Sequence, residues 1–194
     1  MSGEILWSWH LWLTDKPQEN VYPNDAGIMM DRNLGAVSTE QGHVGALGLL
    51  YQWGRKDPFL GTSKIGWQET AKSTNTWDYY EWKSQEDMLM YTTVNPTTYI
   101  YVDLHSPAIP LDPDNWTTSD KEKSKYDPCP LGWRVPDGGK NGVWAKAWDG
   151  VYLGGCIDKD NKGFLFNITS PSTTWYPITG QRYSYSGGLV DCSD

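Results

Sequence analysis

The chain has 194 residues, including 12 tryptophans, 12 tyrosines, 20 glycines and 12 prolines, and its formal net charge is −8 at pH 7. This charge argues against nucleic acid or an anionic membrane surface as a partner, because both require a basic surface. The sequence is also not membrane-spanning, since no run approaches the roughly 20 apolar residues that cross a bilayer. The composition predicts one domain over residues 1–194, with short strands, long irregular loops, one or two helices and an aromatic core.

The first expected element covers residues 5–13, where the side chains alternate in polarity. In an extended chain, Trp7, Trp9, Leu11 and Leu13 would lie on the more apolar side. This alternation predicts a β-strand with that side buried.

Residues 28–34 are the second strand candidate, and they carry Asp31 and Arg32. Neighbouring charges in a buried strand must satisfy each other or the backbone. We therefore interpret the pair as structural rather than catalytic. The glycine spacing in residues 42–48 resembles a phosphate-binding loop only in outline, because the strand and the lysine of that motif are missing.

Residues 47–53 fit a strand or a short helix, which the turn at residues 54–58 ends. Residues 61–91 form an aromatic and polar insertion that is too short to be a separate domain. Within it, Ser84 is followed three residues later by an acid, which is a helix-start signal for a short helix. Residues 95–102 are rich in β-branched and aromatic side chains and predict a strand.

Residues 103–125 are expected to be a loop in which Asp112 and Asp114 precede Trp116. Clustered carboxylates with carbonyl oxygens are ligands for Ca²⁺, so these two residues are the metal candidates of the chain. A turn with a solvated acidic face explains the same residues, and we favour it. No cofactor is expected, with calcium as the alternative.

Residues 126–136 read YDPCPLGWRVP. Each proline fixes its own φ and biases the preceding residue toward extended conformations. The string therefore predicts a rigid connector, with Trp133 anchored in a core. Farther along, Trp144 and Trp148 would share one face of a helix, which is more typical of core residues than of a ligand platform.

A hairpin is expected next, with strands at residues 152–157 and 164–168 and a turn at residues 158–163. The turn begins like an EF-hand loop, with acids at the first and third places. However, Lys162 stands where an acid is expected and Thr169 replaces the bidentate glutamate, so we interpret it as a hairpin turn.

Residues 174–188 mix tyrosine, serine, glycine and arginine, which is the composition of many binding loops. Rigid aromatic rings give contact area there, and small polar groups adapt their hydrogen bonds. An exposed hairpin would have the same composition. The ligand-binding candidates are the aromatic and cationic side chains of this stretch: Trp175, Tyr176, Arg182, Tyr183 and Tyr185.

Three dense strings occur in order. The first covers residues 30–36 together with residues 48–59, the second covers residues 95–100, and the third covers residues 126–136. In order and spacing they resemble the Fibrobacter succinogenes major paralogous domain. This module recurs in surface lipoproteins and fimbrillin-like proteins of the Bacteroides group. The resemblance runs from about residue 5 to the end, and it implies an α+β, C-type-lectin-like fold that displays irregular loops on a fixed frame. In the family, the segment that matches residues 175–182 resembles frame rather than a ligand loop.

The chain departs from that family at its end. Relatives continue past Leu189 with further closing strands, whereas this chain stops at Asp194. The resemblance implies that Cys129 pairs with a closing strand that is missing here, so Cys129 is either free or paired with Cys192. With Cys156 the cysteines number three, which leaves one thiol over. Residues 1–3 carry no secretion signal, so a natural signal or lipid anchor would have been removed.

These observations lead to one main hypothesis, a non-enzymatic binding domain of a bacterial cell-surface or fimbrial adhesin. It would be extracellular or on the outer-membrane surface and would recognise a glycan or a surface protein through loop aromatics. The alternative is a pilin-like structural subunit, whose sheet another chain completes by strand addition. A carbohydrate-active enzyme is the third hypothesis. We expect no enzyme, because catalytic motifs are missing and no acid pair stands out.

Overall fold

The fold is described from a computed structural model. The structure describes residues 3–61, 77–78, 84–100, 113–117, 120–148, 156–179, 181–182 and 189–190. The two α-helices in these ranges are α1 (Gln85–Val94) and α2 (Val143–Trp148). Short 3-10 helices cover Val44–Ala46, Pro113–Trp116 and Gly139–Asn141.

The strands are short, and most of them pair antiparallel. They are β1 (Glu19–Tyr22), β2 (Gly27–Met30), β3 (Leu50–Tyr51), β4 (Pro58–Phe59), β5 (Trp77–Asp78), β6 (Tyr99–Ile100), β7 (Cys156–Asp158), β8 (Gly163–Asn167), β9 (Thr173–Pro177), β10 (Gln181–Arg182) and β11 (Leu189–Val190). The pairs are β1–β2, β3–β4 and β10–β11, with β5–β6 the parallel exception. The β7–β8–β9 sheet is a three-stranded meander.

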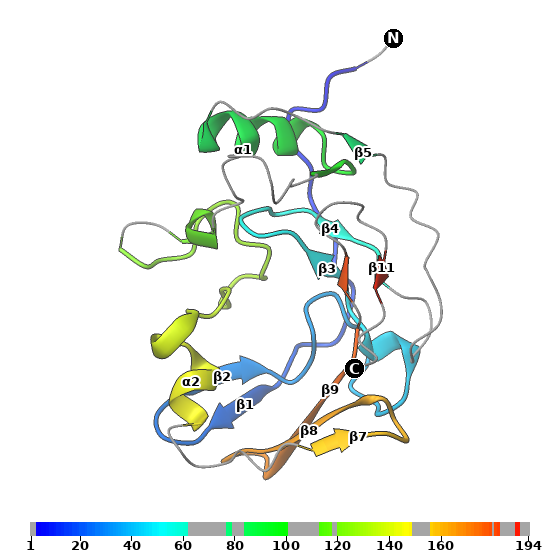
Figure 1. The fold of residues 1–194 in the computed structure, drawn as a ribbon, viewed down its shortest axis with the longest axis vertical. Helices are drawn as coiled ribbons and strands as arrows, with labels where there is room; N and C mark the ends of the chain where they lie inside the picture. Colours follow the sequence, from blue (N-terminus) through cyan, green and yellow to red (C-terminus); the bar gives the residue numbers. More distant parts are fainter. Residues whose placement is uncertain are drawn as a thin grey trace.

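Few helices and short antiparallel strand pairs make this an α+β arrangement, as the sequence predicts at that level. Figure 1 shows α1 at one end of the long axis, and β1, β2, α2 and the β7–β9 sheet at the other. The predicted hairpin is confirmed: β7 pairs with β8 across a turn in which Asp158 Oδ1 accepts a 3.0 Å hydrogen bond from Asn161 N.

One core lies where α2 packs against the β1–β2 hairpin and the meander. Tyr22, Ala26, Ala147 and Ile168 are its buried members. The Trp144 ring of α2 packs edge-on against Tyr22, with centroids 5.4 Å apart. Aromatic contacts of this kind stabilise beyond their buried area, so α2 and β1 form one unit. Trp148, the predicted partner of Trp144, is described in its backbone alone.

A second core, centred on the guanidinium of Arg55, joins β3–β4 to α1 and β6. Arg55 is 1 % exposed and donates to Gln52 Oε1 at 2.8 Å and to Thr98 O at 2.7 Å. It also donates to the carbonyls of Asn95 and Pro96. Burial lowers the pKa of this guanidinium to about 10. It still carries its charge at neutral pH. The hydrogen bonds come from Nη1 and Nη2, whereas no described group accepts from the buried Nε–H.

Helix α1 begins as the sequence predicts. Ser84 is extended, and its Oγ accepts a hydrogen bond from Asp87 N at 3.1 Å. A side-chain oxygen at this position satisfies one of the free N–H groups of the first turn. Elsewhere the expected elements are shorter than predicted: the strand at residues 28–34 ends at Met30, and residues 47–53 contain the two-residue strand β3. Of the strand predicted at residues 95–102, residues 99–100 form β6. Residues 95–98 are instead the C-cap of α1 and a turn, and residues 101–102 lie outside the described residues.

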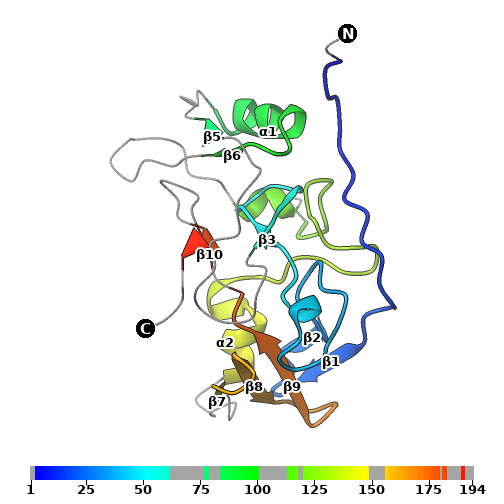
Figure 2. The ribbon, with the colours of Figure 1, turned by 90° about the vertical axis from the view of Figure 1, so that its right-hand side faces the viewer.

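The strand predicted at residues 5–13 is wrong. This segment is extended, but in the described part of the chain no backbone-to-backbone hydrogen bond joins it to a neighbour. Side chains hold it instead: Trp12 Nε1 donates to Ala36 O at 3.0 Å, and Ser8 Oγ donates to Asp57 Oδ1 at 2.6 Å. Figure 2 shows the segment descending along one side of the molecule toward β1.

The predicted buried side of this segment is largely exposed. Trp9 is 79 % exposed, Leu11 81 % and Leu13 86 %. Alternation shows which side chains would be buried together, but burial also needs a neighbouring layer. Residues 5–13 are called the apolar segment below.

The rigid connector at residues 126–136 is organised by Asp127, whose side chain is 0 % exposed. Its two oxygens accept from the backbone N–H groups of Cys129 and Val135, each at 2.8 Å, and Lys123 Nζ lies 2.7 Å from Oδ1. The prediction for Trp133 is corrected, because this side chain is half-buried and lines a surface groove. Cys129 is a free thiol, and burial raises its pKa to about 12.

Candidate functional site

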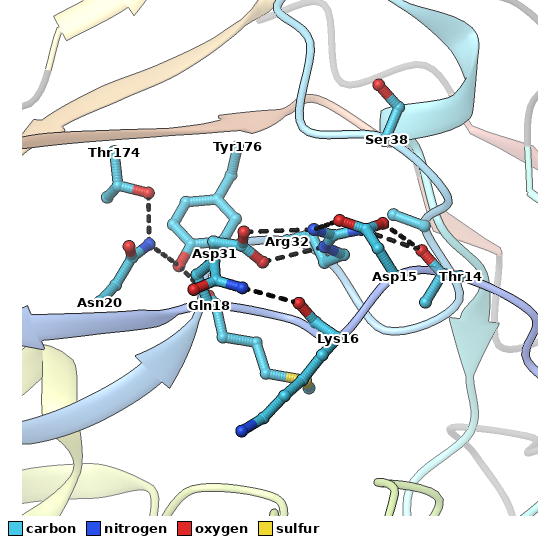
Figure 3. Close-up of polar contacts among 12 residues, drawn as sticks. Thr14, Asp15, Lys16, Gln18, Asn20, Asp31, Arg32, Ser38, Thr174 and Tyr176 are labelled. Carbon is cyan, nitrogen blue, oxygen red and sulfur yellow. Dashed lines mark hydrogen bonds and ion pairs between the residues drawn. The ribbon is translucent and has the colours of Figure 1, made fainter. Parts of the chain in front are cut away.

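The candidate site lies where the β1–β2 hairpin meets β9, and a buried arginine supports one side of it. Arg32 is the second residue after β2 and is 7 % exposed. Its Nε donates to Asp31 Oδ1 at 2.9 Å, and its Nη1 donates to Asp15 Oδ1 at 2.8 Å and Thr14 Oγ1 at 2.9 Å (Figure 3). The prediction that Asp31 and Arg32 satisfy each other is confirmed.

Arg32 also shifts the titration of its partners. Its hydrogen bond, together with one from Thr14, lowers the pKa of Asp15 to about 2. The two carboxylates raise the pKa of Arg32 in turn. Because Arg32 is shared between two carboxylates and a hydroxyl, it holds Asp31 in a fixed position beside the start of β1.

A second set of hydrogen bonds ties the hairpin to β9. Asn20 Nδ2 donates to Thr174 Oγ1 at 2.6 Å, and Tyr176 Oη donates to Met30 O at 2.8 Å (Figure 3). Tyr22 Oη lies 3.2 Å from Tyr176 Oη. The pKa of Tyr22 is raised, chiefly because the side chain is buried and also because Tyr176 is its neighbour. These bonds fix the separation between the two strand systems.

Between these two networks lies a pocket of about 320 Å³, called the polar pocket below. Its volume is at the lower end of the range of about 300 to 1,000 Å³ for small-molecule sites. Amides, hydroxyls and one carboxylate predominate in its lining: Gln18, Asn20, Asp31, Thr39, Gln41, Leu165, Pro171, Thr173, Thr174 and Trp175. Among these described residues Asp31 alone is charged, and Arg32 neutralises it.

Trp175 is the one predicted ligand-binding residue that lines the polar pocket. The expectation of an exposed loop ring is corrected, because Trp175 lies within β9 and is 6 % exposed. It pairs with Leu165, and its indole lies over Gly163 of the neighbouring strand. The missing side chain at Gly163 leaves room for the ring. The Nε1–H of Trp175 is buried, and no described group accepts a hydrogen bond from it.

The remaining predicted residues are placed differently. Tyr176 is half-buried in β9, and its hydroxyl is held by the bonds described above. Arg182 belongs to β10 and is described in its backbone alone, while Tyr183 and Tyr185 lie outside the described residues. The structure therefore brings Trp175 to the pocket and leaves Tyr176 in the network beside it.

The metal candidates cannot be placed as a pair, because Asp112 lies outside the described residues and Asp114 is described in its backbone alone. Where side chains are described, no three His, Cys, Asp or Glu residues gather as ligands for one ion would. None of the helices described is long and apolar enough to cross a membrane.

Sequence reasoning missed Gln18, Asn20, Thr39 and Gln41. They come from the entry to β1 and from the loop after Arg32, whereas Trp175 is more than 130 residues away along the chain. No local pattern joins segments at such a distance. The one signal in the sequence is the run of uncharged amides and hydroxyls beside strand candidates.

The fold and the polar pocket define a small α+β domain of short strand pairs with a neutral, hydrogen-bonding depression on its surface. Compared with protein-family models, with curated proteins and with solved structures, the chain matches none. The resemblance to the Fibrobacter succinogenes major paralogous domain therefore stays a prediction.

Proposed function

We propose that this chain is a non-enzymatic, glycan-binding domain of a bacterial surface or fimbrial adhesin, and that the polar pocket binds a neutral sugar unit. One observation carries the proposal: amides and hydroxyls converge on a pocket that Trp175 also lines. Sugar hydroxyls donate and accept hydrogen bonds. Carboxamides and threonine hydroxyls also do both, so they can pair with either function of a sugar hydroxyl. The proposal includes a C-type-lectin-like frame and an extracellular or outer-membrane location.

The pocket is supported from behind, which favours binding. The hydrogen bonds of Asn20 to Thr174 and of Tyr176 to Met30 fix two of its walls before a ligand arrives. A site whose groups are already ordered loses less conformational entropy on binding. Trp175 adds ring surface to the lining, while its Nε1–H is buried against Gly163.

A glycan array with calcium, and again with a chelator, tests this proposal. Gln18→Ala and Gln41→Ala should each weaken binding of a selected neutral glycan by about tenfold, because each removes one or two hydrogen bonds. Gln85→Ala in α1 is the matched control and should leave binding unchanged. An array without a hit, or equal binding by all variants, would refute the proposal. Loss of binding in the chelator would indicate that binding requires a metal ion, for which Asp112 and Asp114 are the candidate ligands.

The apolar segment favours a second candidate function, a structural subunit that pairs with another chain. Trp9, Leu11 and Leu13 are exposed on an extended backbone without described ladder partners. Such a backbone can accept another strand by β-augmentation. In this reading the partner pairs along residues 5–13, rather than near Leu189, which already pairs with Arg182 in the β10–β11 ladder.

Analytical ultracentrifugation tests this second candidate. The chain should self-associate or capture a strand, and Leu11→Ser with Leu13→Ser should shift it to monomer. Exposed substitutions of this kind should leave the unfolding free energy within about 0.5 kcal/mol. A monomer at all concentrations that also binds no strand peptide would exclude it.

A further inference from the structure

A second depression, distinct from the polar pocket, lies between the β1–β2 hairpin, α2 and the segment 131–137, which is the end of the connector together with Asp137. It has a volume of about 620 Å³, and we call it the hairpin groove. Figure 1 shows α2 beside the hairpin at this end of the molecule. None of its lining residues lines the polar pocket.

The floor of the hairpin groove combines an aromatic ring with a fixed ion pair. Trp133 is half-buried and lines the groove. Beside it, Arg134 Nη1 and Nη2 each donate to one oxygen of Asp137 at 3.1 Å. A forked pair of this kind holds both side chains in one plane. Arg134 Nη1 also donates to Val135 O at 2.9 Å, and the two paired side chains are partly exposed.

The rim of the groove is positively charged, in contrast with the chain as a whole. Lys16 and Lys146 are exposed lining residues, and no described group forms an ion pair or side-chain hydrogen bond with either ammonium. The Lys16 side chain points away from the Arg32 network (Figure 3). Glu19 is the opposing charge, because Arg134 and Asp137 neutralise each other. On a chain of net charge −8, this is a local cationic site.

We propose that the hairpin groove binds a carboxylate-bearing sugar unit, such as a uronic acid within an acidic glycan. The Trp133 ring offers an apolar face on which a sugar ring stacks. The two ammonium groups supply charge complementarity to the carboxylate. The forked Arg134–Asp137 pair presents donor and acceptor edges to ring hydroxyls.

An acidic peptide would satisfy the two lysines, but it would make less use of the rest of the groove. A peptide of acidic side chains has no flat apolar face to stack on Trp133. It also has few hydroxyls to bond with the Arg134–Asp137 pair. The combination of ring, ion pair and ammonium groups therefore favours a sugar.

Calorimetry with three probes tests this inference on the intact chain: a tetramer of galacturonic acid, its fully methyl-esterified form and tetraglutamate. The free acid should bind about two- to thirtyfold more tightly than the ester, as two exposed ion pairs predict. Lys16→Gln with Lys146→Gln should abolish that preference. Trp133→Ala should weaken the acid and the ester alike, since stacking does not depend on the carboxylate.

The matched control is Lys125→Gln with Lys159→Gln, which removes the same charge outside the groove and should leave the preference intact. Equal binding of acid and ester, or no binding of either, would overturn the inference. Tetraglutamate binding as tight as that of the uronate would overturn the assignment to a sugar. Gln18→Ala and Gln41→Ala should not change uronate binding, so failure of the proposed function is distinguishable from failure here.

Discussion

At the scale of single residues, buried charges hold the loops of this molecule in place. Asp127 organises the connector at residues 126–136, and Arg32 organises the approach to β1. Each is surrounded by several partners rather than one. A buried charge with a full set of hydrogen bonds is tolerated, but removal of its charge leaves the partners unsatisfied.

Asp127→Asn should lower the free energy of unfolding by about 2 to 4 kcal/mol. Asparagine keeps one acceptor oxygen, so either Cys129 N or Val135 N loses its bond, and Lys123 loses its counter-charge. Urea unfolding of the purified domain measures this change. Asp137→Asn removes an equal charge from a pair whose side chains are 36–37 % exposed and should cost below about 1 kcal/mol. Similar losses for the two variants would contradict this account.

Sequence reasoning succeeded at this scale where the interaction is local. Asp31 and Arg32 are neighbours, and the Ser84 cap lies three residues from Asp87, so short spacing was sufficient to predict both. The sequence does not single out Asp127, although it stands in the proline-rich connector at residues 126–136. Its partners depend on the path of the connector, which the spacing of the prolines does not determine.

At the scale of elements, two strands of the meander fit together because a large ring on β9 lies over a glycine of β8. The Trp175 indole occupies the space above Gly163, where a Cβ would lie 2.3 Å from Nε1 and Cε2 of the ring. This contact places Trp175 at the polar pocket. The strand at residues 5–13 was predicted wrongly because alternation carries no information on whether a second strand lies alongside.

Gly163→Ala should destabilise the domain by about 1 to 3 kcal/mol, because the indole must move or β8 and β9 must separate. The tryptophan emission spectrum should change at the same time, since the ring moves. Gly138→Ala is the matched control, because a Cβ there meets nothing within 4 Å. Unchanged stability of Gly163→Ala would show that the ring does not lie over this glycine in solution.

At the scale of the whole molecule, acidic groups determine the response to pH. Hydrogen bonds from Arg32 and Thr14 lower the pKa of Asp15, the bond from Arg134 lowers that of Asp137, and bonds from Asn161 lower that of Asp158. A carboxylate whose pKa is lowered by folding stabilises the fold at any pH above its pKa in the unfolded chain. That contribution is lost as the pH falls through its pKa in the folded chain.

For Asp15 this window lies between the ordinary pKa of 3.8 and about 2. The unfolding free energy should therefore decline as pH falls below about 4, and the decline should be shallower in Asp15→Asn. Urea titrations at steps of pH between 7 and 2 measure it. Asp160→Asn, in the exposed hairpin turn, should keep the steeper decline. Parallel curves for the two variants and the parent chain would contradict the role of Asp15.

The composition predicts the type of core and the secondary-structure content of the chain, but it does not predict the polar pocket. An aromatic core, short strands and few helices follow from the content of tryptophan, tyrosine, glycine and proline. The prediction that Trp144 is a core residue is corrected, because its ring contacts Tyr22 but is 42 % exposed. The polar pocket could not be predicted, because Gln18, Gln41 and Trp175 meet only after the hairpin, the following loop and the meander are assembled.

The carbonyl cluster around Arg55 has a consequence for the continuity of the chain. Residues 95–100 are held to β3–β4 by the guanidinium and by Gln52, which exchanges hydrogen bonds with Ile100. Their position is therefore set through space by residues 52 and 55, and does not require the intervening peptide bonds. A single proteolytic nick between residues 62 and 83 should yield two fragments that co-elute as one particle and separate only in denaturant.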